Sequence, residues 1–175
     1  TVDRPSHVRI EHHGMQAHQI LYFDGKDFTL ENPVEKVYAT EKLFGDLEQM
    51  FHVVRDTFGI VAPAADLLYP NSYTLLTMNV NGAKILGKEM IGDIVCDHLL
   101  FTRPSVSFQI WISEEAPYLP YKYVVTDTST SHLLSFSTLL TSWDLSPGLS
   151  APLFKYVPGP QASKIVFMKI TESMK

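Results

Sequence analysis

The chain has 175 residues, and its 14 lysines and arginines against 19 aspartates and glutamates give a formal net charge of −5. With 45% hydrophobic and 19% charged residues, it is typical of one globular domain with a sizeable core, which excludes a disordered chain. The acidic balance, without clustered lysines and arginines, excludes a nucleic-acid partner, and no apolar run reaches the roughly 18 residues that a membrane span needs.

Hairpin-linked strands are predicted for the N-terminal part of the chain. Apolar and polar residues alternate over residues 8–12, a second run covers 18–23, and two shorter runs follow before residue 40. After the second run, the dipeptide Asp24-Gly25 is typical of a type I′ turn, because both residues tolerate positive φ angles. We therefore expect an antiparallel meander.

A helix is predicted over residues 46–58, where the apolar residues change to helical spacing. Asp46 is a favourable N-cap, Gln49 completes a capping box with it, and Gly59 suits the position after the last turn. The apolar stripe consists of Leu47, Met50, Phe51, Val54 and Phe58.

Two short helical segments are expected next. The first starts at Pro63 and ends near Pro70, because proline suits the first helical position and terminates a helix from outside. The spacing over residues 72–80 leaves a further helical turn open.

The rest of the chain returns to strands. They are predicted over residues 83–91, 94–102, 106–113, 119–126 and 163–170. Gly92-Asp93 is a two-residue hairpin signal, and the serines and threonines of 133–143 favour a strand over a helix there. Strands, then helices, then strands predict an α+β fold with an antiparallel sheet in a single domain, residues 1–175.

Sequence motifs for catalysis are missing. Residues 82–88 match the spacing of a phosphate-binding loop, but Glu89 stands where that loop needs a serine or threonine for Mg²⁺. The chain carries neither a Gly-x-Ser-x-Gly elbow nor a carboxylate pair that suggests glycosidase chemistry. We therefore predict that the protein is not an enzyme and has no cofactor.

Seven histidines and one cysteine, Cys96, raise the question of a metal site. Cys96 and His98 project from one face of a predicted strand, but zinc needs three or four converging ligands. Beyond that pair, no spacing typical of metal ligands is visible, so we predict no metal site. Instead, we expect Cys96 to pack as a small hydrophobe and His98 to hydrogen-bond within the sheet.

Several motifs follow one another in a recognisable order. They are Ile20-Leu-Tyr-Phe-Asp-Gly-Lys26, Asn32-Pro33, Val37-Tyr38-Ala39-Thr40, Phe58-Gly59-Ile60, Pro63-Ala-Ala-Asp-Leu-Leu-Tyr69, Cys96-Asp97-His98-Leu99, Gln109-Ile110-Trp111-Ile112, Pro120-Tyr-Lys-Tyr-Val124 and Trp143-Asp-Leu-Ser-Pro147. This series resembles a family of predicted bacterial periplasmic proteins, domain of unknown function 2092. The resemblance covers nearly the whole chain, and the linked order is more specific than any one motif.

That family is similar in turn to the periplasmic lipoprotein carriers and lipoprotein-sorting proteins. The resemblance implies a strongly curved antiparallel sheet, an open half-barrel, with a few helices on its concave face. It implies a periplasmic or cell-envelope protein that binds a lipid or lipoprotein acyl chain or another hydrophobic small molecule, and it supplies no catalytic residues. Family members carry a helix and two strands before the position of Thr1, so we expect this chain to lack them. The sheet edge at residues 8–12 would then be exposed for pairing with a second copy as a homodimer.

An apolar pocket is the one candidate site, because a few helices need not fill a half-barrel. Its expected lining consists of Met50, Phe51, Val54, Phe58, Leu68, Phe108, Ile110 and Ile112. The alternative is that these side chains interlock in a fully packed core. The protein would then be an interaction or scaffold domain without a ligand pocket.

Overall fold

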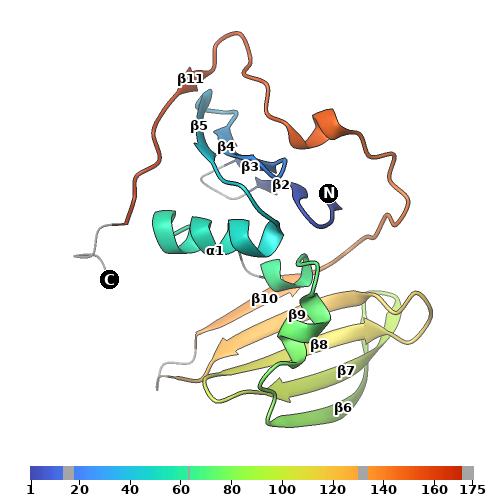
Figure 1. The fold of residues 1–175 in the computed structure, drawn as a ribbon. Helices are drawn as coiled ribbons and strands as arrows, with labels where there is room; N and C mark the ends of the chain where they lie inside the picture. The colour runs from blue at the N-terminus through green and yellow to red at the C-terminus, as the bar shows by residue number, and fades with distance from the viewer. Residues whose placement is uncertain (14–17, 63, 130–133, 171–175) are drawn as a thin grey trace. The chain divides into compact units, whose positions relative to one another are not determined.

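The computed structural model describes residues 1–13, 18–62, 64–129 and 134–170 (Figure 1). The chain divides into two compact units, of which the first combines Thr1–Ser72 with Pro147–Lys175 and the second is Tyr73–Ser146. Each unit holds one sheet, and helices are few and short, so the protein is mostly β. The predicted antiparallel strand pairing is confirmed, but in two sheets.

The first sheet has six strands in the order β1-β2-β3-β4-β5-β11. Their bounds are Val2–Asp3, His7–His13, His18–Phe23, Asp27–Asn32, Val37–Lys42 and Ser163–Lys164. Strands β1 to β5 pair antiparallel in chain order, which confirms the predicted meander. Strand β11 joins the edge of β5 in parallel.

The outer edge of β2 is covered only at its start. Strand β1 pairs with the first residues of β2, and the backbone N–H of Arg9 donates to the Thr1 carbonyl at 2.9 Å. Hydrogen-bonding sides alternate along a strand, so the backbone groups of Glu11 and His13 point to that same outer side. Pairing of this edge with a second copy stays a prediction.

The connection between β3 and β4 is not the predicted type I′ turn. Strand pairing leaves four residues between positions 23 and 28, and of Asp24 and Gly25 only Gly25 has a positive φ, of 82°. The Asp24 carboxylate instead accepts the backbone N–H groups of Lys26 at 3.1 Å and Asp27 at 2.8 Å. This side-chain turn takes the place of the second left-handed residue.

Helix α1, Leu47–Phe58, has the predicted caps. The Asp46 carboxylate accepts the Gln49 N–H at 2.9 Å, the Gln49 side-chain oxygen accepts the Asp46 N–H at 3.1 Å, and Gly59 ends the helix at φ 69°. The two further helical predictions correspond to a 3₁₀ turn at Ala65–Leu67 and to α2 at Ser72–Thr77, while Pro63 lies outside the described residues.

The second sheet has five strands in the order β10-β9-β8-β7-β6, all antiparallel. In chain order they span Gly82–Ile91, Ile94–Thr102, Val106–Ser113, Pro120–Asp127 and Ser135–Leu139. Gly92 has φ 60° between the paired Ile91 and Ile94, which confirms the two-residue hairpin. Strand β10 confirms the preference for a strand within 133–143, although Leu133 lies outside the described residues.

The predicted last strand, 163–170, is wrong beyond its first two residues. The Phe167 ring stacks on Phe28 of β4, with centroids 5.3 Å apart, and on Phe58 of α1 at 4.7 Å. The Ile170 N–H donates to the Thr57 carbonyl at 2.9 Å. The segment therefore leaves the β5 edge because its aromatic side chain packs between the sheet and α1.

The curvature that a half-barrel requires is not evident, since neither sheet is closed or strongly curled. The half-barrel and the single truncated domain accordingly stay predictions.

Candidate functional site

The predicted pocket residues of α1 pack into the core of the first unit. Met50 is 0% exposed, Val54 1% and Phe51 5%, and the half-buried Phe58 stacks on Phe167. The buried face of α1 is thus occupied by neighbouring side chains, as expected for a packed core.

Leu68 is half-buried at the end of the 3₁₀ turn. Its backbone carbonyl accepts a hydrogen bond from the Arg4 guanidinium at 3.0 Å. This contact holds the backbone of Leu68 in place, and it does not involve the Leu68 side chain.

The remaining predicted residues, Phe108, Ile110 and Ile112, lie on one face of β8 in the second unit. Phe108 and Ile110 are buried, and the Phe108 ring stacks on Phe101 of β7 with centroids 4.9 Å apart. The eight predicted residues therefore divide between two units, and a single pocket lined by all of them stays a prediction.

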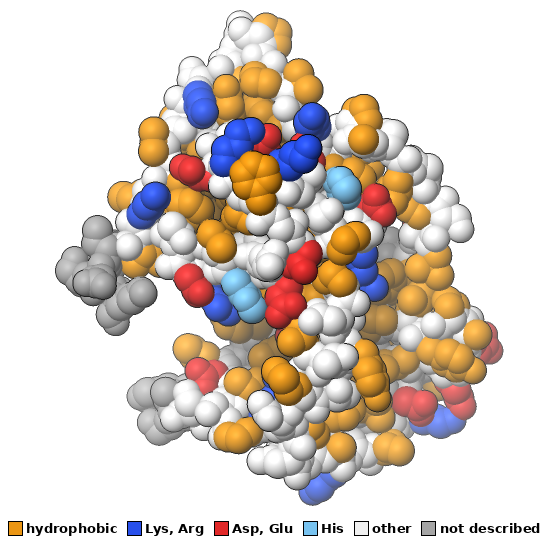
Figure 2. Space-filling model, viewed as in Figure 1, with side chains coloured by type: hydrophobic (Ala, Val, Ile, Leu, Met, Phe, Trp, Pro, Cys, Tyr) orange, Lys and Arg blue, Asp and Glu red, His pale blue; other side chains and the backbone are white. Residues whose placement is uncertain are grey.

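An apolar strip crosses this face of the second sheet. Cross-strand partners share a face, so the pairing places two adjacent rows side by side, one apolar over five strands and the other apolar over four, with Thr138 at its β10 position. The strip consists of Ala83, Ile85, Leu99, Phe101, Phe108, Ile110, Tyr123, Val125 and Phe136. Its centre is buried, but Ile85 on β6 is 77% exposed and Phe136 on β10 is 53% exposed. Hydrophobic side chains are visible over the region of this sheet in Figure 2.

Helix α2 is attached near the centre of the strip by polar contacts. The Arg103 guanidinium donates to the carbonyls of Leu75 and Leu76, each at 2.7 Å, and its central carbon lies 5.3 Å from the centroid of the Phe108 ring. All six residues of α2 are at least partly exposed. The helix therefore depends on Arg103 more than on burial of its own side chains.

The opposite face of the second sheet carries a polar cluster, of which the sequence predicted only the hydrogen bonding of His98. The Glu89 carboxylate accepts the Trp111 indole N–H at 2.8 Å and lies 3.0 Å from Nδ1 of His98. Nε2 of His98 lies 2.7 Å from the side-chain oxygen of Gln109, and the Lys122 ammonium lies 4.2 Å from the centroid of the Trp111 ring. His98 is thus hydrogen-bonded within the sheet, as predicted.

The surroundings of the cluster change the pKa values of two of the side chains on this face, Glu89 and Cys96. The Trp111 hydrogen bond, together with His98, lowers the pKa of the Glu89 carboxyl from its ordinary value. Side-chain oxygens of Glu89 and Gln109 face the two ring nitrogens of His98 and hold the ring in place. Cys96, which is fully buried on the same face, packs as predicted, and burial raises the pKa of its thiol.

Two cavities lie on the polar side of the first sheet. None of the eight residues predicted to line an apolar pocket lines either of them. One, of about 360 Å³, lies between the sheet and residues 154–158. Its charges are largely paired, Lys42 with Asp27 at 2.7 Å and Lys155 with Asp24 at 4.0 Å. Because the charges are neutralised in pairs, this cavity has no strong preference for a charged ligand.

Tyr156 forms the aromatic wall of that cavity. Its ring centroid lies 4.7 Å from Tyr38 and 5.5 Å from Tyr22, and its hydroxyl oxygen is buried without a hydrogen-bond partner among the described residues. Burial raises the pKa of Tyr156 and of Tyr22.

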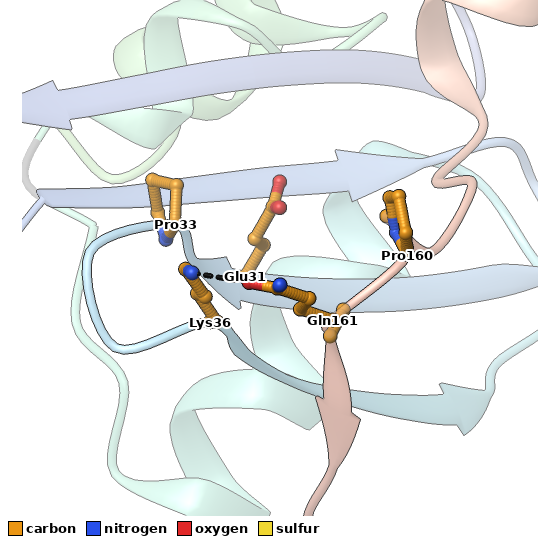
Figure 3. A pocket seen from close by; sticks show the side chains of 7 residues that line it. Glu31, Pro33, Lys36, Pro160 and Gln161 are labelled. Carbon is orange, nitrogen blue, oxygen red and sulfur yellow. Dashed lines mark hydrogen bonds between the residues drawn. The ribbon is translucent and has the colours of Figure 1, made fainter.

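The other cavity, of about 300 Å³, lies beside the β4–β5 turn (Figure 3). Pro33 and Pro160 line it with Glu31, and the Lys36 ammonium donates to the Gln161 side chain at 2.5 Å. That contact holds the segment after residue 158 against the β4–β5 turn. Among the described residues that line this cavity, the side chains form no arrangement typical of catalysis.

Two largely antiparallel sheets define a mostly β protein, and the second carries an apolar strip and a polar cluster on opposite faces. A family model described as "Predicted periplasmic protein (DUF2092)" matches residues 1–168. The chain belongs to this family, domain of unknown function 2092, and the family description confirms the expected periplasmic localisation. No curated protein matches the chain. In the described part of the chain, none of the helices has the length and apolar character needed to cross a membrane.

Proposed function

We propose that this is a non-enzymatic periplasmic protein that binds a hydrophobic ligand, an acyl chain, along the apolar strip of the second sheet. The observation that carries the proposal is the strip, in which the exposed Ile85 ends one row on β6 and the exposed Phe136 ends the other row on β10. Large apolar side chains exposed at both edges of a sheet, in line with its buried apolar centre, are typical of a binding surface. The non-enzymatic part rests on the missing catalytic motifs.

The dimensions and chemistry of the strip suit a long apolar chain. Four spacings of about 4.8 Å between neighbouring strands make it roughly 19 Å across. Each methylene group that a ligand buries there contributes about 0.8 kcal/mol. Because the strip is apolar, it would hold the hydrocarbon part of a ligand and would not select for a particular polar group on it.

Helix α2 supports this proposal as a removable cover. It is held by the hydrogen bonds from Arg103 to Leu75 and Leu76, and each of its residues is at least partly exposed. A ligand that displaced α2 would therefore break hydrogen bonds that water can replace, at little loss of apolar burial. Sheet, strip and helix together would then act as the ligand-holding part of a lipoprotein-carrier-like half-barrel.

Titration of the delipidated full chain with a dansylated fatty acid tests the proposal. We expect saturable binding that is weakened about tenfold or more in Ile85→Asp and in Phe136→Asp, because each places a carboxylate on the strip. The matched control is Val34→Asp, which changes an equally exposed apolar residue of the first unit, 68% exposed, and should leave binding unchanged. Absence of saturable binding, or an equal loss in the control, would overturn the proposal.

A scaffold or interaction domain is the second candidate, and the packing of α1 favours it. Met50 and Val54 are buried in the first unit, so their side chains stabilise a core and leave no room for a ligand there. A folded chain that binds no fatty acid in the titration would support this candidate.

A homodimer through the outer edge of β2 is part of the proposal for partners. It is supported by the backbone groups of Glu11 and His13, which point to the outer side of that strand beyond the pairing with β1. Light scattering over a concentration series tests it, and a monomer throughout would contradict it.

A further inference from the structure

Three potential metal ligands converge at the end of the β2–β3 hairpin. Glu11 and His13 lie two residues apart on β2, and His18 on β3 is the cross-strand partner of His13. Alternate residues of a strand and their cross-strand partners share one face of the sheet, so all three side chains emerge on the same side.

The donor atoms of these side chains are close enough for one ion. Oε1 of Glu11 lies 2.9 Å from Nε2 of His18 and 3.3 Å from Nε2 of His13, and one donor atom from each of the three lies within 4.8 Å of the others. Ligands about 2.0–2.2 Å from a tetrahedral zinc ion are separated from each other by about 3.4 Å. Small side-chain rotations would therefore bring the three donors to coordination distance.

The surroundings of Glu11 orient its carboxylate for this role. The Arg9 guanidinium donates to Oε2 of Glu11 at 3.1 Å, while Oε1 faces both imidazoles. A neighbour that holds one carboxylate oxygen and leaves the other free is the arrangement that positions metal ligands. The stacked rings of His13 and His18, with centroids 4.1 Å apart, keep the two Nε2 atoms on one side.

The group is accessible to ions in solution. The side chains of His18, Glu11 and His13 are 28%, 35% and 68% exposed. Water molecules could thus fill the remaining coordination positions, as in an open site and unlike a closed structural one.

We propose that Glu11, His13 and His18 form a binding site for a divalent transition-metal ion, with Zn²⁺ as the fitting occupant. Two imidazoles and a carboxylate are ligands that Zn²⁺ accepts, and Mg²⁺ or Ca²⁺ would prefer oxygen ligands alone. Sequence spacing does not show the site, because it is completed only when β2 and β3 pair and bring His18 beside His13 and Glu11. The site is independent of the apolar strip, which lies on the other sheet.

Zn²⁺ titration by isothermal calorimetry tests the proposal, with the full chain prepared without a polyhistidine tag and stripped with a chelator. We expect one Zn²⁺ per chain, and affinity reduced about tenfold or more in His13→Ala, His18→Ala and Glu11→Gln. Co²⁺ should give visible absorption bands that the same substitutions abolish. The matched control is His12→Ala, since His12 is the immediate neighbour on the opposite face and should leave the affinity unchanged.

Two results would overturn the site. One is binding that is absent or not saturable at one ion per chain in the unsubstituted protein. The other is an equal loss of affinity in His12→Ala, which would indicate nonspecific binding to histidine-rich strands. Far-UV circular dichroism of each variant shows whether it is folded, and Glu11→Gln, which preserves size and hydrogen bonding, decides the question if a histidine variant is not.

Discussion

His98 on β7 and Trp111 on β8 are cross-strand partners whose rings stack 4.0 Å apart, with planes 16° from parallel. Both hydrogen-bond to the carboxylate of Glu89 on β6. Three neighbouring strands are therefore joined by one carboxylate, on the far side of the β-bulge that shifts the register between Ile85 and Gly87. Because a one-residue slip would reverse every side chain of β6, this cluster fixes the strand register beyond the bulge.

The indole N–H of Trp111 stabilises the cluster. Trp111→Phe keeps an aromatic ring against His98 but removes the donor to Glu89, so we expect the free energy of unfolding to fall by about 1–2 kcal/mol. Urea unfolding followed by circular dichroism measures the change. Tyr118→Phe is a suitable control, because Tyr118 is 64% exposed and the substitution should have little effect; equal stability of both variants would contradict this role for Trp111.

Glu89 should make stability depend on pH in the acid range. The pKa of its carboxyl is lowered in the folded state from the ordinary 4.5, chiefly by the Trp111 hydrogen bond. A lowered folded-state pKa contributes stability that is present above the unfolded-state value and lost as pH falls through the folded-state value. We therefore expect the stability difference between the unsubstituted chain and Glu89→Gln to be largest above pH 4.5 and to shrink below it.

Urea unfolding at a series of pH values from neutral to acid measures this difference. Glu115→Gln, in the exposed β8–β9 connection, serves as the control. A difference for Glu89→Gln that stayed constant through the acid range would show that its carboxylate makes no linked contribution.

Local signals were enough to predict α1 and the β6–β7 hairpin. Asp46, Gln49 and Gly59 are all in the roles that their chemistry favours, and Gly92 supplies the positive φ that a two-residue turn needs. These features depend on residues within a few positions of one another, so they can be predicted from a short stretch of sequence. At Asp24 the same reasoning was wrong, because the side chain forms a turn of its own.

Distant contacts could not be predicted in this way. The departure of the C-terminal segment from β5 depends on Phe167 packing against Phe28 and Phe58, which are far from it in sequence. The polar cluster likewise needs Glu89 and Trp111 to meet across two strand pairings. Trp111 belongs to one of the recognised motifs and Glu89 to none of that series, and no local spacing indicates that the two side chains meet.

The capping box of α1 should contribute measurably to stability. Asp46→Ala removes the carboxylate that accepts the Gln49 N–H at 2.9 Å, and we expect it to lower the free energy of unfolding by about 1 kcal/mol. Asp46→Asn retains an acceptor at the N-cap and should stay within a few tenths of a kcal/mol of the unsubstituted chain. Thermal and urea unfolding of the two variants compare them, and equal losses would mean that charge, and not the cap hydrogen bond, matters there.

Val53 and Val54 distinguish a packed core from a pocket on α1. Val54 is 1% exposed and Val53 is 42% exposed on the same turn of the helix, so their substitutions have equal helix propensity effects and different burial. If the α1 face is a packed core, Val54→Ala leaves a cavity and should lower the free energy of unfolding by about 2 kcal/mol, while Val53→Ala should change it by less than about 0.5 kcal/mol. If that face instead lined a ligand pocket, the cavity would add to existing space. Val54→Ala would then affect stability little and fatty-acid affinity strongly, and urea unfolding together with the dansyl titration separates the two outcomes.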